Sequence, residues 1–77
     1  AGGHNPHTMK TGQRVRLTTH IAPSGLVMES LADICEARIP GTIMAPSQPK
    51  GWLLIAFDNM PNGDRLNVHA SMLTPHR

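Results

Sequence analysis

Four oxygen-bearing side chains stand close together in the segment FDNMPNGDRLNVHASML, residues 57–73, and could in principle hold a cation. They are Asp58, Asn59, Asn62 and Asp64. A calcium loop of the helix-loop-helix type takes oxygen ligands at positions 1, 3 and 5 and a carboxylate at position 12. Counted from Asp58, position 3 is Met60 and position 12 is His69, so two of these ligands are absent. The segment is therefore interpreted as a turn without a metal.

The same segment carries a hairpin signal. Asn62 and Gly63 separate the apolar run WLLIAF from the alternating run RLNVHA. Both residue types tolerate a positive φ, which the tightest hairpin turns require. We expect a hairpin centred on this dipeptide, with Asp58 and Asp64 capping backbone donors of the turn.

Groups for catalysis are scattered along the chain. Nucleophilic catalysis needs a serine or cysteine beside a base and a group that orients the base. The candidates are Cys35, His20, His69 and Asp58, and no local motif brings them together. Zinc sites need cysteine and histidine pairs a few residues apart, and Cys35 stands alone. We expect no catalytic residue, no metal and no cofactor, and therefore a protein that is not an enzyme.

Two of these residues have ordinary structural readings. Cys35 is expected to be a buried small hydrophobic residue, since Asp33 and Glu36 beside it disfavour a reactive thiolate. His69 is expected to be a solvated surface residue, with a pH-sensing or interface role as the alternative.

The size and composition of the chain limit its function. Its 77 residues make one domain, and a domain this short buries only about 60% of the surface that its unfolded chain exposes. The single cysteine excludes a disulfide within the chain, so a partner is a natural source of extra stability. The formal charge of +2 is too small to imply a nucleic-acid partner by itself. No apolar run approaches the roughly 20 residues that cross a bilayer, so we expect a soluble cytoplasmic protein without a membrane partner.

The start of the chain differs from the rest in composition. Residues 1–8, AGGHNPHT, are rich in glycine and polar residues, as in a leftover expression tag or a disordered tail. His4 and His7 would bind nickel or copper only weakly there. We expect a single small β-barrel domain over residues 9–77.

Four segments are expected to be strands. Alternation over residues 12–21 turns Val15 and Leu17 to one face, and residues 41–46, GTIMAP, follow Gly41 as a second strand. Residues 52–58, WLLIAFD, predict the third strand. The last strand, residues 64–70, precedes a single turn of 3₁₀ helix in Ser-Met-Leu.

Residues 26–40 predict a long connection with only a turn or two of helix. Apolar residues including Leu31 and Ile34 recur there at helical spacing, whereas Pro40 limits the length of any helix. The acids Glu29 and Asp33 are interpreted as part of a solvated face.

The third strand supplies a candidate protein-binding surface. Its apolar run leaves no polar side for water, so we expect cover on both faces. In a small barrel one set of alternate side chains lies outside, where a second copy or a larger protein would bind it. The alternative cover is the segment 26–40. The candidate binding residues are Trp52, Leu53, Leu54, Ile55 and Phe57.

Nucleic-acid binding is the alternative function. Arg14 and Arg16 share the outer face of the first strand, and Lys50 and Arg65 could extend a basic stripe. Single-strand binders also use aromatic stacking platforms. The chain has no tyrosine. Its one tryptophan and one phenylalanine, Trp52 and Phe57, lie in the apolar third strand, where a core role is expected instead.

Taken together, the segments GQRVRL, GTIMAP, GWLLIAFD and RLNVHASML resemble the SH3-like small barrel. The resemblance covers residues 10–75. It implies a mostly β fold with about five antiparallel strands and a long first connection.

Within that group the chain is similar to the plasmid and integron type of dihydrofolate reductase, which has a similar length, an early Gly-x-Arg-Val-Arg stretch and a late Gly-Trp. That family carries its reaction on a Val-Gln-Ile-Tyr run at the centre of a tetramer. The matching place here reads Leu66-Asn67-Val68-His69, without the glutamine and the tyrosine. The resemblance thus implies a bacterial or mobile-element accessory protein, with a reductase of this type as a remote alternative. A looser resemblance to the barrel subunit of ferredoxin-thioredoxin reductase implies a domain that supports a partner.

Overall fold

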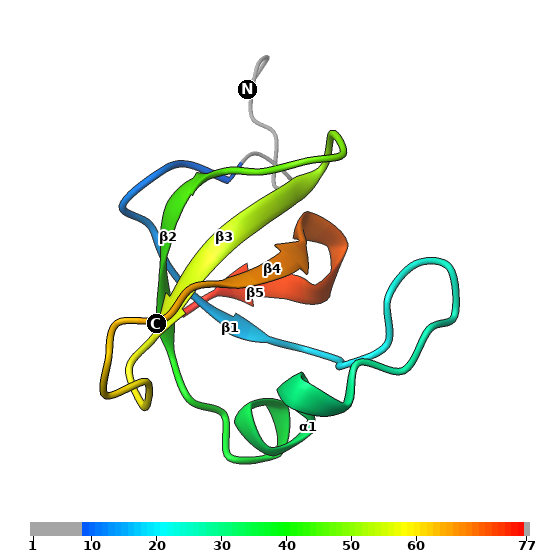
Figure 1. Cartoon of the computed structure of the whole chain (residues 1–77), viewed down its shortest axis with the longest axis horizontal. Coiled ribbons are helices and arrows are strands. Elements are labelled where there is room, and N and C mark those ends of the chain that lie inside the picture. Colours follow the sequence, from blue (N-terminus) through cyan, green and yellow to red (C-terminus); the bar gives the residue numbers. More distant parts are fainter. Residues whose placement is uncertain (1–8, 77) are drawn as a thin grey trace.

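Five strands form one antiparallel sheet in the computed structural model, which describes residues 9–76 (Figure 1). The strands are β1 (Arg14–Leu17), β2 (Gly41–Pro46), β3 (Trp52–Phe57), β4 (Leu66–His69) and β5 (Leu73–Pro75). Their order across the sheet is β4-β3-β2-β1-β5. The fold is mostly β, as expected, but β4 and β5 are free edges and the sheet is not closed. The expectation about residues 1–8 lies outside the described residues.

Alternating side chains explain the first strand. Val15 and Leu17 are buried, whereas Arg14 and Arg16 lie on the other face. Antiparallel pairing places β1 between β2 and β5, with Arg16 opposite Thr74 of β5. The predicted inward and outward sets of this strand are therefore confirmed.

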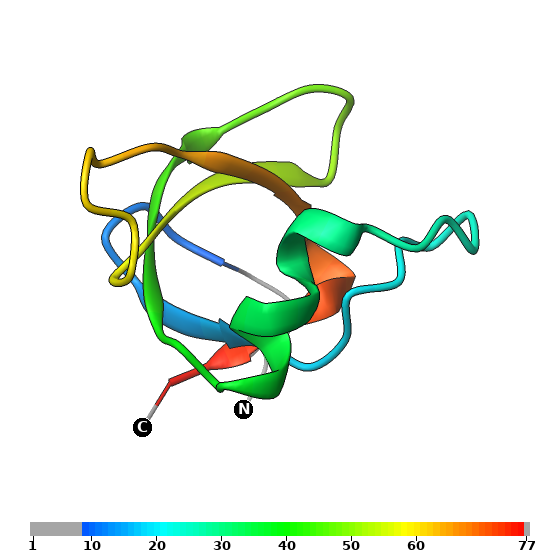
Figure 2. The same cartoon turned by 60° about the horizontal axis from the view of Figure 1, so that its bottom comes forward.

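The pairing of β2 with β3 contains an irregularity. Ile43 is paired with Ile55 and Ala45 with Leu54, so Met44 is one extra residue on β2. Such a bulge bends its strand and increases the local twist. Figure 2 shows that the sheet is strongly curved.

A short helix, α1 (Glu29–Glu36), and a single 3₁₀ turn, η1 (Ala70–Met72), complete the described elements. Leu31 and Ile34 of α1 are buried in the same core as the strands, and α1 packs chiefly against β1. Both the short helix within residues 26–40 and the 3₁₀ turn before the end of the chain confirm the sequence predictions. The eight residues of α1 fall well short of a membrane span, and no other helix in the described range is long or apolar enough for one.

The expected cover of β3 on both faces is wrong. Ile55 and Phe57 on its inner face are buried, but Trp52, Leu54 and Ala56 remain partly exposed. The reason is the position of α1, whose apolar side chains join the core instead of crossing the outside of β3. The outer face of this strand is therefore only partly covered.

The connection between β3 and β4 is a wider loop than expected. The N–H of Met60 donates to the carbonyl of Phe57 (3.0 Å), and the N–H of Gly63 donates to the carbonyl of Met60 (3.2 Å). Pro61 takes the second position of the latter turn, where its fixed φ fits. Gly63 has a φ of 70°, but Asn62 has no positive φ. The two strands pair as a hairpin, but the prediction of a tight turn centred on Asn62-Gly63 is wrong.

A second, smaller hairpin lies between β1 and α1 and extends away from the sheet in Figures 1 and 2. Ile21 and Val27 face each other across it as an antiparallel pair. The N–H of Ala22 donates to the carbonyl of Leu26 at 2.8 Å. We call residues 21–27 the projecting hairpin.

Candidate protein-binding surface

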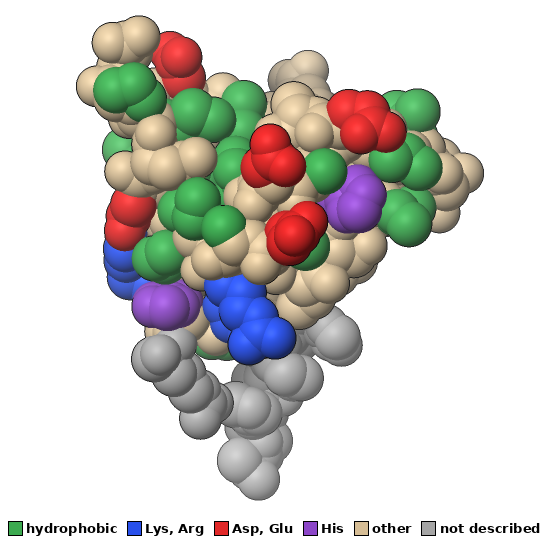
Figure 3. All heavy atoms as spheres, turned by 90° about the horizontal axis from the view of Figure 1, so that it is seen from below, with side chains coloured by type: hydrophobic (Ala, Val, Ile, Leu, Met, Phe, Trp, Pro, Cys, Tyr) green, Lys and Arg blue, Asp and Glu red, His purple; other side chains and the backbone are tan. Residues whose placement is uncertain are grey.

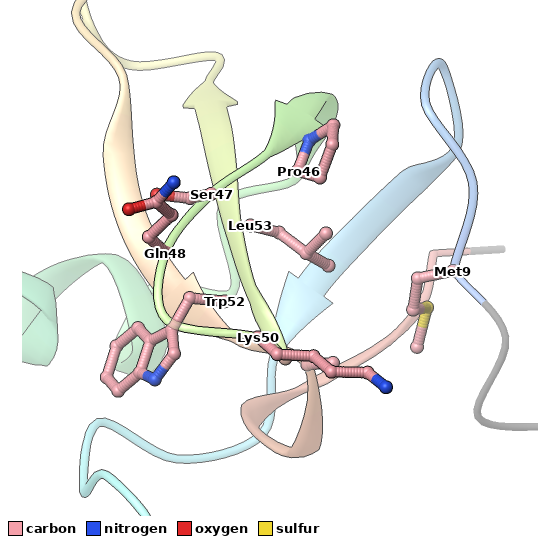
Figure 4. Close-up of a pocket in the computed structure, with 9 residues that line it drawn as sticks. Met9, Pro46, Ser47, Gln48, Lys50, Trp52 and Leu53 are labelled. Atoms are coloured by element: carbon pink, nitrogen blue, oxygen red, sulfur yellow. The ribbon is translucent and has the colours of Figure 1, made fainter.

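An apolar recess of about 470 Å³ lies beside the turn that joins β2 to β3 (Figure 4). It is lined by Met9, Pro46, Ser47, Gln48, Lys50, Gly51, Trp52, Leu53 and Ala70. Figure 4 shows the Leu53 side chain directed toward the space between Pro46 and Met9, whereas Trp52 points to the other side of β3. The charged end of Lys50 lies at the rim. An apolar hollow with few polar groups is the common form of a binding site.

Backbone hydrogen bonds hold the turn beside this recess. The N–H of Ser47 donates to the carbonyl of Trp52 (2.9 Å), and the N–H of Trp52 donates to the carbonyl of Pro49 (3.1 Å). The carbonyl of Gly51 accepts from the N–H of Ala70 at 2.8 Å, which ties the turn to η1. Gly51 has a φ of 97°, a conformation that side chains disfavour. The recess is therefore formed by an ordered turn.

Trp52 lies against His69 of the neighbouring strand. The two rings meet edge to face, with their centroids 5.4 Å apart. The backbone N–H of Ser71 donates to Nδ1 of His69 (3.1 Å), and the Ser71 hydroxyl lies 2.8 Å from the same atom. Because Nδ1 accepts a hydrogen bond, the neutral ring carries its proton on Nε2. His69 thus holds the indole ring on the side of β3 opposite the Leu53 side chain.

The structure divides the five predicted interface residues into two groups. Ile55 and Phe57 have exposed fractions of 0% and 2% and belong to the core. Trp52 and Leu53 line the recess, and Leu54 lies between two strands on the outer face of the sheet. The surface that a partner could reach is therefore smaller than the set expected from sequence.

Several lining residues were not found by sequence reasoning. Met9 and Ala70 stand at opposite ends of the domain, and only the fold brings them beside β3. Pro46 could have been recognised as a surface position, because proline at the end of a strand marks a free edge or a turn. Ala70 follows β4 directly, at the start of the predicted 3₁₀ turn.

Arg14 is engaged in an ion pair across the sheet. Its guanidinium donates two hydrogen bonds to the carboxylate of Asp58, at 2.9 and 2.5 Å, and a third to the hydroxyl of Thr42 at 2.8 Å. The hydrogen bond from Arg14 holds the pKa of Asp58 below its ordinary value. Asp58 therefore binds a distant side chain, whereas a cap within its own turn was expected.

The four basic residues of the nucleic-acid alternative are not aligned in one row. Arg14 is opposite Thr42 at the start of β2, whereas Lys50 lies beyond the end of that strand. Arg16 is paired with Thr74 of the edge strand β5, and Arg65 precedes β4 at the other edge. A partner would have to cover several strands to contact them together.

The chain matches no protein-family model, no curated protein and no solved structure. Its function must therefore be argued from its own residues.

Groups with reactive side chains remain apart in the described part of the chain. Within residues 9–76 no three His, Cys, Asp or Glu side chains come close enough to hold a metal ion. Cys35 is a free thiol that is partly buried against the core. The recess beside Trp52 and Leu53 is thus the feature with the clearest capacity to bind.

Proposed function

We propose that this protein is a non-catalytic binding module that self-associates or docks on a larger protein partner. The observation that carries the proposal is the apolar recess beside the β2–β3 turn, in which the side chains of Leu53 and Pro46 face an occupant. Apolar pockets of this kind frequently hold the anchor residues of a protein interface. A short chain also gains stability by burying such a surface.

An SH3-like barrel architecture is part of this proposal. The strand order β4-β3-β2-β1-β5 and the 3₁₀ turn before the last strand support it, as does the strong curvature of the sheet in Figure 2. Folds of this type serve many functions, so the architecture alone does not name a partner. We also place the protein in the cytoplasm as a bacterial or mobile-element accessory protein, where the free thiol of Cys35 would stay reduced.

Sedimentation equilibrium with recess variants tests the self-associating form. Leu53→Ala should lower the measured association, because it removes a side chain that points into the recess, whereas Asn59→Asp on the distant β3–β4 loop should not. A protein that stays monomeric up to about 1 mM would reject self-association, since even weak specific contacts form dimers in that range. Docking on a larger partner is tested by comparing capture by wild type and by Leu53→Ala. Equal capture would reject the recess as the docking surface.

The absence of catalysis is tested by one direct assay. Dihydrofolate reduction with NADPH is the reaction to measure, because the resemblance to the plasmid and integron type reductases suggests it. We expect no turnover, since Asn67 and His69 stand where that family has glutamine and tyrosine. Clear turnover would contradict the proposal, and unfolding of the protein by a chelator would contradict the expectation that no metal is bound.

A further inference from the structure

The large hydrophobic side chains that are most exposed all lie on the projecting hairpin. Among the described residues, Ile21, Leu26 and Val27 have exposed fractions of 45%, 65% and 45%, and no other large hydrophobic residue is classed as exposed. Figure 3 shows hydrophobic side chains gathered at the right-hand end of the molecule, over this hairpin. Isolated exposed hydrophobic residues are ordinary, whereas a group of them marks an interaction site.

The projecting hairpin is an ordered element. The N–H of Gly25 donates to the carbonyl of Ala22 at 2.8 Å and closes a turn through Pro23. The φ of Gly25 is 91°, which completes the common hairpin loop of a type I turn followed by a left-handed residue. The N–H of Met28 donates to the carbonyl of His20 at 2.8 Å, which fastens the base of the hairpin. A preformed element loses little conformational entropy when it binds.

Charge distinguishes the hairpin from the recess. Glu29, Asp33 and Glu36 are exposed on α1, which follows the hairpin directly, and Figure 3 shows acidic side chains beside the hydrophobic group. The recess has Lys50 at its rim and no acidic residue in its lining. An apolar projection flanked by acids therefore complements an apolar recess flanked by a base.

Size also matches. The recess of about 470 Å³ lies in the range of roughly 300–1,000 Å³ that is usual for pockets with a specific occupant. The aliphatic ends of Leu26 and its neighbours are chemically suited to its walls, which include Pro46 and Leu53.

We infer that the projecting hairpin of one copy inserts into the recess of a second copy. This inference rests on the proposed function, because it names the occupant of the same recess. The hairpin and the β2–β3 turn lie apart in both Figure 1 and Figure 2, so the recess of a copy is left to another molecule. Such a contact is head-to-tail, and each assembly keeps one free hairpin and one free recess at its ends. Since the contact is small, its dissociation constant is expected in the micromolar to millimolar range, about 10⁻⁶–10⁻³ M.

A mixing experiment with two variants tests this inference. Leu26→Asp disables the hairpin, and Pro46→Asp disables the recess; both side chains are exposed, so the fold should be retained. By sedimentation equilibrium, the mass of the wild type should rise with concentration and continue beyond the dimer. Each variant alone should stay monomeric. An equimolar mixture should form dimers and nothing larger, because one intact hairpin meets one intact recess.

Two control variants accompany the mixture. Leu26→Met keeps an apolar side chain on the hairpin and should associate like the wild type. Asn59→Asp adds the same charge as the test variants on a distant loop and should also associate normally. Raised salt should weaken the wild-type assembly, because it screens the attraction between Lys50 and the acids of α1. If Pro46→Asp has an altered circular dichroism spectrum, Lys50→Glu takes its place as the recess variant.

Each other outcome overturns the inference in a recognisable way. Association that is lost in Pro46→Asp but kept in Leu26→Asp would leave the recess as a binding site with a different occupant. A mixture that stays monomeric, or that grows beyond the dimer, would exclude the head-to-tail contact. A wild type that is monomeric at all concentrations would exclude any self-association, and the capture experiment with Leu53→Ala would then decide the remaining form of the proposed function.

Discussion

Gly41 shows how one backbone position controls the packing between two strands. It is buried at the start of β2 opposite Phe57, and an added Cβ would lie 2.8 Å from Cγ2 of Ile55 and 3.1 Å from the carbonyl oxygen of Ala56. These contacts are shorter than ordinary van der Waals contacts, so the side chains of Ile55 and Phe57 or the backbone of β3 would have to shift. The glycine at this place is required by space and not by an unusual φ.

We predict that Gly41→Ala destabilises the protein by about 1–3 kcal/mol, the usual cost of overfilling a packed core. The free energy of unfolding is measured by urea titration followed by circular dichroism. Ser30→Ala on the exposed side of α1 is the control and should change that free energy by only about 0.5 kcal/mol. Wild-type stability in Gly41→Ala would mean that β2 and β3 are not held as closely as described.

The ion pair of Asp58 with Arg14 makes the free energy of unfolding depend on pH in the acid range. The hydrogen bond from Arg14 lowers the pKa of Asp58 in the folded protein. A carboxyl with a depressed folded-state pKa contributes stability that is complete above its unfolded pKa and is lost as the pH falls through the folded value. Asp58→Asn should therefore make stability less sensitive to pH between about 2 and 5. Urea midpoints across this range check the prediction, with Asp64→Asn as the control; equal acid sensitivity in wild type and Asp58→Asn would refute it.

The elements that the sequence predicted correctly are those with local signals. The bounds of β2 follow from Gly41 at its start and Pro46 at its end, and alternation in β1 identified Val15 and Leu17 as core residues. Such patterns depend on neighbours in the chain. The prediction for the β3–β4 turn was wrong because Pro61 also restricts the local backbone. The sequence alone does not show whether Pro61 or Asn62 determines the turn.

Less of the candidate site was predictable, because exposure depends on what the other elements cover. The apolar run of β3 predicted a buried strand. Which face of β3 stays partly exposed depends on the position of α1, which the sequence does not give. Of the residues expected at an interface, Trp52 and Leu53 line the recess, whereas Ile55 and Phe57 belong to the core. The ion pair of Arg14 joins residues 44 positions apart, and no local pattern in the sequence predicts a contact over that separation.

Two substitutions separate the observed β3–β4 loop from the tight turn that the sequence suggested. Gly63 has a φ of 70°, so Gly63→Val should cost on the order of 1 kcal/mol or more in unfolding free energy. Asn62 has no positive φ and its side chain is exposed, so Asn62→Ala should cost only about 0.5 kcal/mol or less. Urea titration of both variants provides the measurement. A large loss in Asn62→Ala would support a turn centred on Asn62-Gly63.

On the scale of the whole molecule, the distribution of charge separates protein binding from nucleic-acid binding. Arg14 is paired with Asp58, and Lys50 stands at the opposite end of β2. We predict no salt-dependent binding of nucleic acid in gel-shift titrations at two salt concentrations. A shift at low salt that weakens at high salt and in Arg14→Ala and Arg16→Ala would favour the nucleic-acid alternative, since contacts with phosphates produce that dependence.

The pairing of β1 with β5 has a consequence for how the protein emerges from the ribosome. Val15 is paired with Pro75, so β1 gains one of its two neighbours only after 60 further residues have been added. At about 5–20 residues per second, this interval lasts roughly 3–12 s. During that time one edge of β1 is without its final partner, and Val15 and Leu17 lack the cover that Leu73 provides in the finished core. This sheet can therefore be completed only after β5 has been synthesised and has left the ribosome.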